Sequence, residues 1–183
     1  MTGNPVSFVR MSVEEERISR FEEAVRPQLD SAHNLARWLT GSDADAGDVV
    51  QEACVRALRY FDGFHGGEVR PWFMAIVRNC AYTQLGRRPR TEELLDGAAL
   101  ADARGGSIEA ELEREDERAA LGRALEGLAP EFREAIVLRE LEGLSYKEIS
   151  AVTGAPIGTV MSRLSRARLL LLKRLGGSEG VRS

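Results

Sequence analysis

The sequence predicts an all-α protein of two small helical domains joined by a flexible acidic linker. Alanine, leucine, arginine and glutamate dominate its 183 residues, and all four favour helices. Aromatic residues make up only 6%, and no useful length of chain shows the alternating β-branched pattern of a strand. The 43% hydrophobic and 30% charged residues are the balance of a globular chain with a core.

The helical patterns fall into two groups. Apolar residues recur at helical spacing over 13–39, 43–62, 70–86, 108–127, 130–141, 145–152 and 156–175. Between the third and fourth patterns the chain contains one proline, three glycines and several acids, a composition typical of linkers. We therefore expect a first domain at 10–86, a linker at 87–107 and a second domain at 108–175.

Cysteine usage and hydropathy indicate the compartment. With only two cysteines, Cys54 and Cys80, the chain is no disulfide scaffold and fits a reducing compartment. The apolar run from Leu169 to Leu172 is short, whereas a membrane span needs about 20 apolar residues. The first residues lack the apolar centre of a secretory signal. We therefore expect a cytoplasmic protein without membrane contact.

Chemistry-bearing residues are not grouped as an enzyme needs them. The two histidines and two cysteines have no metal-site spacing. Paired catalytic carboxylates, a nucleophile elbow and a phosphate loop are absent from the sequence. We therefore expect no enzyme, no metal and no other cofactor.

The C-terminal domain carries the pattern of a helix-turn-helix over 145–168. Ser145 and Glu148 form a capping box, which starts a helix by satisfying two backbone N–H groups reciprocally. Gly154 ends this helix because glycine readily adopts the left-handed conformation, and Pro156 suits the first turn of the next helix. Three positions match the spacing of the motif: Ser150, Gly154 and Val160.

The second helix of this motif is expected to have an apolar side and a basic side that is a candidate DNA surface. Its expected apolar stripe consists of Ile157, Val160, Met161, Leu164 and Leu171. The chain has a net charge of −4, but Pro156 to Leu175 contains five cations and no acid, and the local field governs attraction to DNA. The side chains expected in a major groove are Thr159, Ser162, Arg163 and Arg166. Arg168 is expected to pack its stem or pair with a neighbour. The alternative is a surface hairpin with a solvated basic face.

Two features of the N-terminal domain are candidates for binding. The polar side of the helix over 43–62 consists of Asp45, Asp48, Gln51, Glu52 and Arg56, and by charge alone it is a solvated face. The helix from Pro71 combines aromatic and basic side chains, which suit single-stranded DNA because rings stack on bases and cations follow the backbone. These residues are Trp72, Arg78, Asn79, Tyr82, Arg87 and Arg88. Trp72 can equally be a core anchor.

Three segments, in this order, resemble the bacterial extracytoplasmic-function (ECF) sigma factors. They are DAGDVVQEACVRALRYFDGF, RPWFMAIVRNCAYTQLGRR and, beyond a variable linker, LAPEFREAIVLRELEGLSYKEISAVTGAPIGTVMSRLSRARLLLLKRL. The likeness extends over most of the chain, and the joint occurrence of both halves makes it specific, since helix-turn-helix patterns alone are common. The resemblance implies a sigma-2 domain followed by a sigma-4 domain.

The resemblance also implies a role for each surface. The polar side with Asp45, Asp48, Gln51, Glu52 and Arg56 would bind the clamp helices of core RNA polymerase. The loop with Phe64 and the helix after it would capture and open the minus-ten promoter element, with Asn79 on the family's Arg-Asn pair and Arg87 and Arg88 at its basic end. The helix-turn-helix would bind the minus-thirty-five element. The implied function is an alternative sigma factor for promoter recognition and strand opening. The implied partners are core RNA polymerase, promoter DNA and an anti-sigma factor or other regulatory protein.

Four positions depart from the family pattern: Gly47, Thr83, Gly86 and Ser150. The family often has an acid at the first of these, so the hypothesis follows that Gly47 weakens polymerase docking. Two other functions stay open. A stand-alone helix-turn-helix regulator predicts self-dimers on palindromic sites. A protein-interaction module without DNA binding predicts that Arg163→Ala and Arg166→Ala leave function intact.

Overall fold

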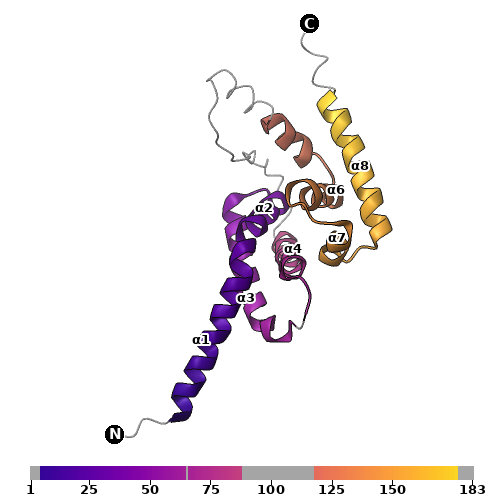
Figure 1. The fold of residues 1–183 in the computed structure, drawn as a ribbon. Helices are drawn as coiled ribbons and strands as arrows, with labels where there is room; N and C mark the ends of the chain where they lie inside the picture. Colours follow the sequence, from indigo (N-terminus) through magenta and orange to yellow (C-terminus); the bar gives the residue numbers. More distant parts are fainter. Residues whose placement is uncertain (1–4, 65, 88–117, 177–183) are drawn as a thin grey trace, which may run out of the picture.

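The computed structural model describes residues 5–64, 66–87 and 118–176, and every regular element in these ranges is helical. The first half contains α1 (Pro5–Val25), the 3₁₀ turn η1 (Arg26–Gln28), α2 (Leu29–Thr40), α3 (Asp43–Tyr60), the 3₁₀ turn η2 (Phe61–Gly63) and α4 (Val69–Arg87). The second half contains a helix over 118–126, α6 (Pro130–Ile136), the π-helical turn η3 (Val137–Leu141), α7 (Tyr146–Thr153) and α8 (Ile157–Gly176). Figure 1 shows α1 extending away from the other helices and α8 on the opposite side of the molecule. The all-α prediction is confirmed.

The first predicted helix is divided in the structure. The pattern over 13–39 predicted one continuous helix, whereas α1 and α2 are separated by η1. Pro27 lies in this turn. Its ring clashes with the preceding turn of a helix and it has no N–H to donate, so the chain starts a new helix there. The expected linker from residue 88 onward, and residues 108–117 of the second domain, lie outside the described residues.

In the first half α2, α3 and α4 pack against one another in pairs. A turn at Gly41, with φ of 75°, ends α2. Ser42 then begins α3, because its hydroxyl accepts the backbone N–H of Asp45 at 3.3 Å. Large side chains from all three helices fill the space between them, among them Leu35, Val49, Phe73, Met74 and Val77. This packing fixes the outer sides of α3 and α4, which carry the predicted binding residues.

The buried side of α8 differs from the predicted stripe. Val160 and Leu164 are buried as expected, and Ala167 continues the buried row. Ile157 and Met161, however, are 46% and 50% exposed. At 100° per residue these two residues lie on one flank of the buried row. The stripe was therefore predicted with the wrong rotation about the helix axis, because apolar residues occupy about half of the circumference of this helix.

The two halves pack together through their helices. α2 contacts α6 and η3, and α4 contacts α7. The buried apolar side chains of both halves form one continuous cluster, which runs from Phe21 in α1 to Ala167 in α8. No helix within the described ranges is long and apolar enough to cross a membrane. The described chain is therefore a closed arrangement in which α4, a predicted DNA-binding helix, is partly covered by the second half.

Candidate nucleic-acid and polymerase interfaces

The helix-turn-helix is built as its sequence predicted. The Ser145 N–H donates to the Glu148 carboxylate at 2.6 Å, and the Glu148 N–H donates to the Ser145 hydroxyl at 3.2 Å. These hydrogen bonds lower the pKa of the Glu148 carboxyl. Gly154 ends α7 with φ of 71°, in the left-handed region. Ser150, a departure from the family pattern, donates its hydroxyl to the Ala155 carbonyl at 2.6 Å and so bridges the turn. The start of α8 is thereby held in one orientation.

The predicted DNA-reading residues share one side of α8. Ser162 and Arg166 are exposed, and Thr159 and Arg163 are half-buried. At 100° per residue these four positions lie within an arc of about 100°, whose centre is about 120° around the helix from the buried row. The Ser162 hydroxyl donates to the Thr159 carbonyl at 2.9 Å. Arg168 lies off this side and pairs with Glu140 at 2.6 Å, which confirms its expected pairing with a neighbour.

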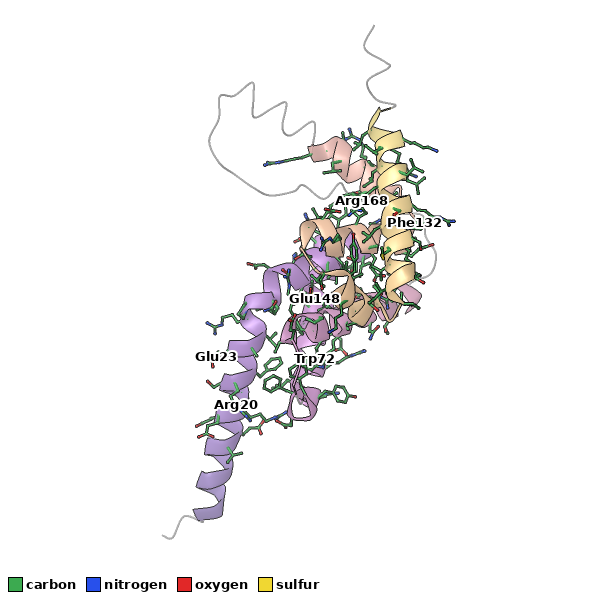
Figure 2. All side chains as sticks on the ribbon, turned by 45° about the vertical axis from the view of Figure 1, so that its right-hand side comes forward. Arg20, Glu23, Trp72, Phe132, Glu148 and Arg168 are labelled. Carbon is green, nitrogen blue, oxygen red and sulfur yellow. The ribbon has the colours of Figure 1, made fainter. Side chains whose placement is uncertain are left out.

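Aromatic rings connect the turn after α3 to the core. The Phe64 and Trp72 rings lie 4.7 Å apart between centroids, and Phe61 lies 6.3 Å from Trp72. Figure 2 shows Trp72 beside this turn. Gly66 and Gly67 have φ of 75° and 135°, conformations that side chains rarely adopt, so the turn requires glycine at both positions. Trp72 is partly buried against the core, and it also presents an aromatic neighbour to Phe64.

Two of the predicted minus-ten residues face the second half of the chain. Arg78 donates its Nε to the Glu134 carboxylate at 2.5 Å, and its guanidinium lies 4.7 Å from the centre of the Tyr82 ring. Glu134 is only 1% exposed, and burial raises the pKa of its carboxyl against the lowering effect of Arg78. Burial also raises the pKa of Tyr82. Asn79 remains exposed. The side chain of Arg87, and all of Arg88, lie outside the described residues.

The polar side of α3 is exposed at three of the five predicted positions. Asp48, Gln51 and Glu52 are exposed, and Arg56 is half-buried and pairs with Glu52 at 2.6 Å. Asp45 is a correction, since it is only 7% exposed and accepts a hydrogen bond from the Gln84 side chain at 3.1 Å. The sequence placed Asp45 on the polar side of this helix, whereas the structure buries its side chain; its role in binding core polymerase stays a prediction. Its burial follows from the contact of α3 with α4.

Sequence reasoning missed the polar residues between the two halves. Arg70 donates to the main-chain oxygen of Glu142, and the Asn34 amide donates to the Glu142 carboxylate at 2.5 Å. Arg133 donates to the Trp38 carbonyl at 3.2 Å. One of these residues has a signal in the sequence. Glu134 precedes Val137 by three residues and Leu138 by four, so it lies on the apolar side of its helix. An acid in such a position needs a buried partner.

The fold and these surfaces define a class of protein: a helical DNA-binding protein with a helix-turn-helix in its second half. Residues 24–91 match the family described as Sigma-70 region 2, and residues 118–171 match Sigma-70, region 4. The chain is 37% identical over 155 residues to the ECF RNA polymerase sigma-E factor of Escherichia coli, a match that covers 79% of this chain and 80% of that one. It is 36% identical over 150 residues to the ECF RNA polymerase sigma factor SigE of Mycolicibacterium smegmatis. That match covers 81% of this chain and 58% of the longer relative. The chain therefore belongs to the ECF RNA polymerase sigma factors.

Solved structures are similar across both halves. The sigma factor RpoE of Bartonella quintana, solved in complex with the anti-sigma factor NepR, has a TM-score of 0.70 and 29% identity, covering 86% of this chain and 97% of that one. CnrH, solved in complex with the cytosolic domain of CnrY, has a TM-score of 0.63 and 26% identity, covering 86% and 88%. Members of this family are DNA-binding transcription initiation factors. The chain is thus an alternative sigma factor, and the stand-alone regulator is not favoured.

Proposed function

We propose that this chain binds core RNA polymerase through α3 and contacts promoter DNA through α8 and α4. The observation that carries the proposal is the separation of two exposed surfaces. Asp48, Gln51 and Glu52 lie on α3 in the first half, and the basic side of α8 lies in the second half. An initiation factor needs both kinds of surface at once, one for the enzyme and one for the DNA.

At the minus-thirty-five element, α8 enters the major groove. Thr159 and Ser162 lie in its first turns, where hydroxyl groups reach base edges. Arg163 and Arg166 on the same side bind phosphates or guanine edges. The hydrogen bond from Ser150 to Ala155 supports this role, because it ties α7 to the residues directly before α8.

At the minus-ten element, the first half captures an unstacked base. The Phe64 and Trp72 rings, 4.7 Å apart, offer flat apolar surfaces on which a base can stack, and the exposed Asn79 offers hydrogen bonds to its edge. Arg78, Tyr82, Arg87 and Arg88 complete this surface. Strand opening by this route needs no covalent chemistry. The function is therefore that of a binding protein, which acts in the cytoplasm with the polymerase.

An anti-sigma factor is the further partner we propose. Two similar structures were solved as complexes, RpoE with the anti-sigma factor NepR and CnrH with the cytosolic domain of CnrY. The matches extend over 86% of this chain in both cases, so they include both halves. A regulator that binds both halves at once is the arrangement that this proposal predicts.

Run-off transcription with purified core RNA polymerase tests the function. Genomic fragments serve as templates, and polymerase without this chain serves as the control. New, discrete start sites are the expected result, and their upstream sequences then define both promoter elements. If the chain neither binds core polymerase nor yields transcripts, the proposed function is wrong. Binding without transcripts would contradict the promoter-recognition part alone.

A further inference from the structure

We propose that Glu134 competes with promoter DNA for Arg78 and thereby holds the two halves of the free chain closed. Glu134 belongs to α6 in the second half, and Arg78 belongs to α4 in the first. The inference rests on the proposed minus-ten role of Arg78. It goes beyond that role by assigning a regulatory function to a residue that touches neither DNA nor polymerase.

The contact between these residues has the geometry of a recognition pair. The Arg78 Nε and a second guanidinium nitrogen lie 2.5 Å and 3.3 Å from the two different oxygens of the Glu134 carboxylate. The same forked donor arrangement binds the oxygens of a phosphate. Glu134 therefore presents to Arg78 the chemistry that a DNA backbone would present. Because the two residues are 56 positions apart, the pair forms only when the halves are together.

A second proposed DNA-binding residue lies in the field of the same carboxylate. The positive charge of Arg163 in α8 acts with that of Arg78 to lower the pKa of Glu134, against the larger effect of burial. One buried anion is thus close to a cation from each of the two DNA-binding helices. Closure brings Arg78 to this anion, which is already in the field of Arg163 within the second half.

Other polar contacts fix how the halves meet. At the first turn of α4, the Arg70 guanidinium reaches both the main-chain oxygen and the carboxylate of Glu142, and Asn34 donates to that carboxylate. At the end of α2, Arg133 donates to the Trp38 carbonyl. Arg133 also caps the preceding helix by donating to the Leu125, Glu126 and Leu128 carbonyls. These contacts orient α6 so that Glu134 meets Arg78.

The pair of Arg78 and Glu134 contributes little net stability, so DNA can displace it. Removing two charges from water offsets much of their attraction, so a buried ion pair adds little net stability. Burial does raise the pKa of Glu134, which shows that its charge is held at a cost. Losing Arg78 is different, because the unpaired Glu134 carboxylate, only 1% exposed, strongly disfavours the closed state. DNA can therefore replace Glu134 by offering Arg78 another anion while Glu134 gains water.

The test uses the full chain without polymerase and two measurements. Small-angle X-ray scattering gives the radius of gyration, which reports closure. Fluorescence anisotropy with a labelled single-stranded oligonucleotide of random sequence gives the affinity for DNA. The variants are Glu134→Gln, Arg78→Gln and the charge swap that combines Arg78→Glu with Glu134→Arg. The matched control is Glu140→Gln, which removes the same charge and breaks an ion pair with Arg168 inside the second half.

We expect Glu134→Gln to enlarge the radius of gyration and to tighten DNA binding about tenfold, because more of the chain is open and Arg78 is released. The Glu134→Gln variant also gains a phosphate contact, so the dependence of log affinity on log salt steepens by about one unit. Arg78→Gln opens the chain without this gain in affinity. The charge swap restores the compact form, and Glu140→Gln matches the unchanged chain in both measurements.

The opposite outcomes overturn either the proposal or the proposed role of Arg78. If Glu134→Gln matches Glu140→Gln in both measurements, or if a folded charge-swap variant stays open, the proposal is overturned. If Arg78→Gln gains as much DNA affinity as Glu134→Gln, the closing contact stands and the proposed minus-ten role of Arg78 is wrong. If far-ultraviolet circular dichroism shows that Glu134→Gln is unfolded, the charge-swap variant alone decides. A compact charge-swap variant supports the proposal, and an open one overturns it.

Discussion

Gln84 near the end of α4 donates a hydrogen bond of 3.1 Å to the carboxylate of Asp45 near the start of α3. The two side chains tie these helices together just beneath the exposed surface that carries Asp48 and Gln51. The carboxylate also lies in the first turn of α3, where a negative charge favours the helix dipole. Asp45 therefore joins α3 to α4, and we propose that it supports the polymerase-binding surface rather than contacting the polymerase.

Substituting Asp45 and Asp48 should separate stability from polymerase binding. Asp45→Ala leaves the Gln84 amide without this acceptor, so the free energy of unfolding should fall by about 1–3 kcal/mol. Asp48→Ala changes an exposed residue, so unfolding should change by less than about 0.5 kcal/mol while polymerase affinity falls. Urea unfolding and a binding titration with core polymerase measure both. Equal loss of polymerase affinity in the two folded variants would contradict this division.

Gly47 offers a gain of function. An added Cβ there meets nothing within 4 Å, and the residue is exposed on α3. Gly47→Glu and Gly47→Ala should both stabilise the chain by about 0.5–1 kcal/mol, because glycine is a poor residue inside a helix. Only Gly47→Glu should strengthen polymerase binding, since it adds the acid that the family often has. The hypothesis about this position fails if both variants bind polymerase alike.

Two arginines of α8 should behave differently at a promoter. Arg166→Ala removes an exposed cation from the proposed groove side and should weaken binding to the minus-thirty-five element by about 1–3 kcal/mol. Arg168→Ala removes the same charge from the same helix but breaks an exposed pair with Glu140, worth about 0–1 kcal/mol, that lies off the groove side. Run-off transcription at promoters mutated in each element compares them. Equal effects of the two variants would argue against the assigned groove side.

The turn of the helix-turn-helix should tolerate no side chain at Gly154. This residue has φ of 71°, so Gly154→Ala should cost about 1–2 kcal/mol. Gly158 in α8 is the control, because an added Cβ there meets nothing within 4 Å and Gly158→Ala should stabilise by about 0.5–1 kcal/mol. Thermal unfolding of both variants measures the difference. A stabilising Gly154→Ala would show that the turn is not held in the left-handed region.

The capping box should make part of the stability depend on pH. Hydrogen bonds from Ser145 lower the pKa of Glu148 below its ordinary value of 4.5. The ionised form is therefore favoured in the folded chain, so its contribution is present above pH 4.5 and is lost as the pH falls through the lowered pKa. Glu148→Gln keeps an acceptor but loses the charge. The stability difference from the unchanged chain should be constant near neutral pH and shrink in acid, as urea unfolding at several pH values can show.

Features that depend on neighbouring residues could be predicted from the sequence. The capping box of Ser145 and Glu148 and the turn at Gly154 follow from local backbone chemistry, and the structure has both as expected. Exposed positions of the proposed binding surfaces, such as Asp48 and Arg166, also follow from helical spacing. Spacing alone did not place the apolar stripe, because Ile157 and Met161 flank a buried row that Ala167, a small residue, completes.

Contacts between distant parts of the chain could not be predicted in the same way. The burial of Asp45 depends on Gln84, 39 positions later, and the partner of Arg78 is 56 positions away. Helical periodicity gives the side of a helix that is apolar, but it does not say which other helix covers a polar residue. The pairing of Glu134 with Arg78 depends on how the two halves of the chain meet.

The apolar cluster shared by both halves makes the lifetime of the chain in the cell depend on whether it is bound. The cluster runs without interruption through both halves. Separating the halves therefore exposes to water apolar side chains that are buried in the closed form. Newly wetted apolar surface attracts proteases, chaperones and other unfolded chains. We therefore expect the lifetime of this sigma factor in the cell to follow its occupancy, long when it is closed or bound to polymerase and short when it is open and alone.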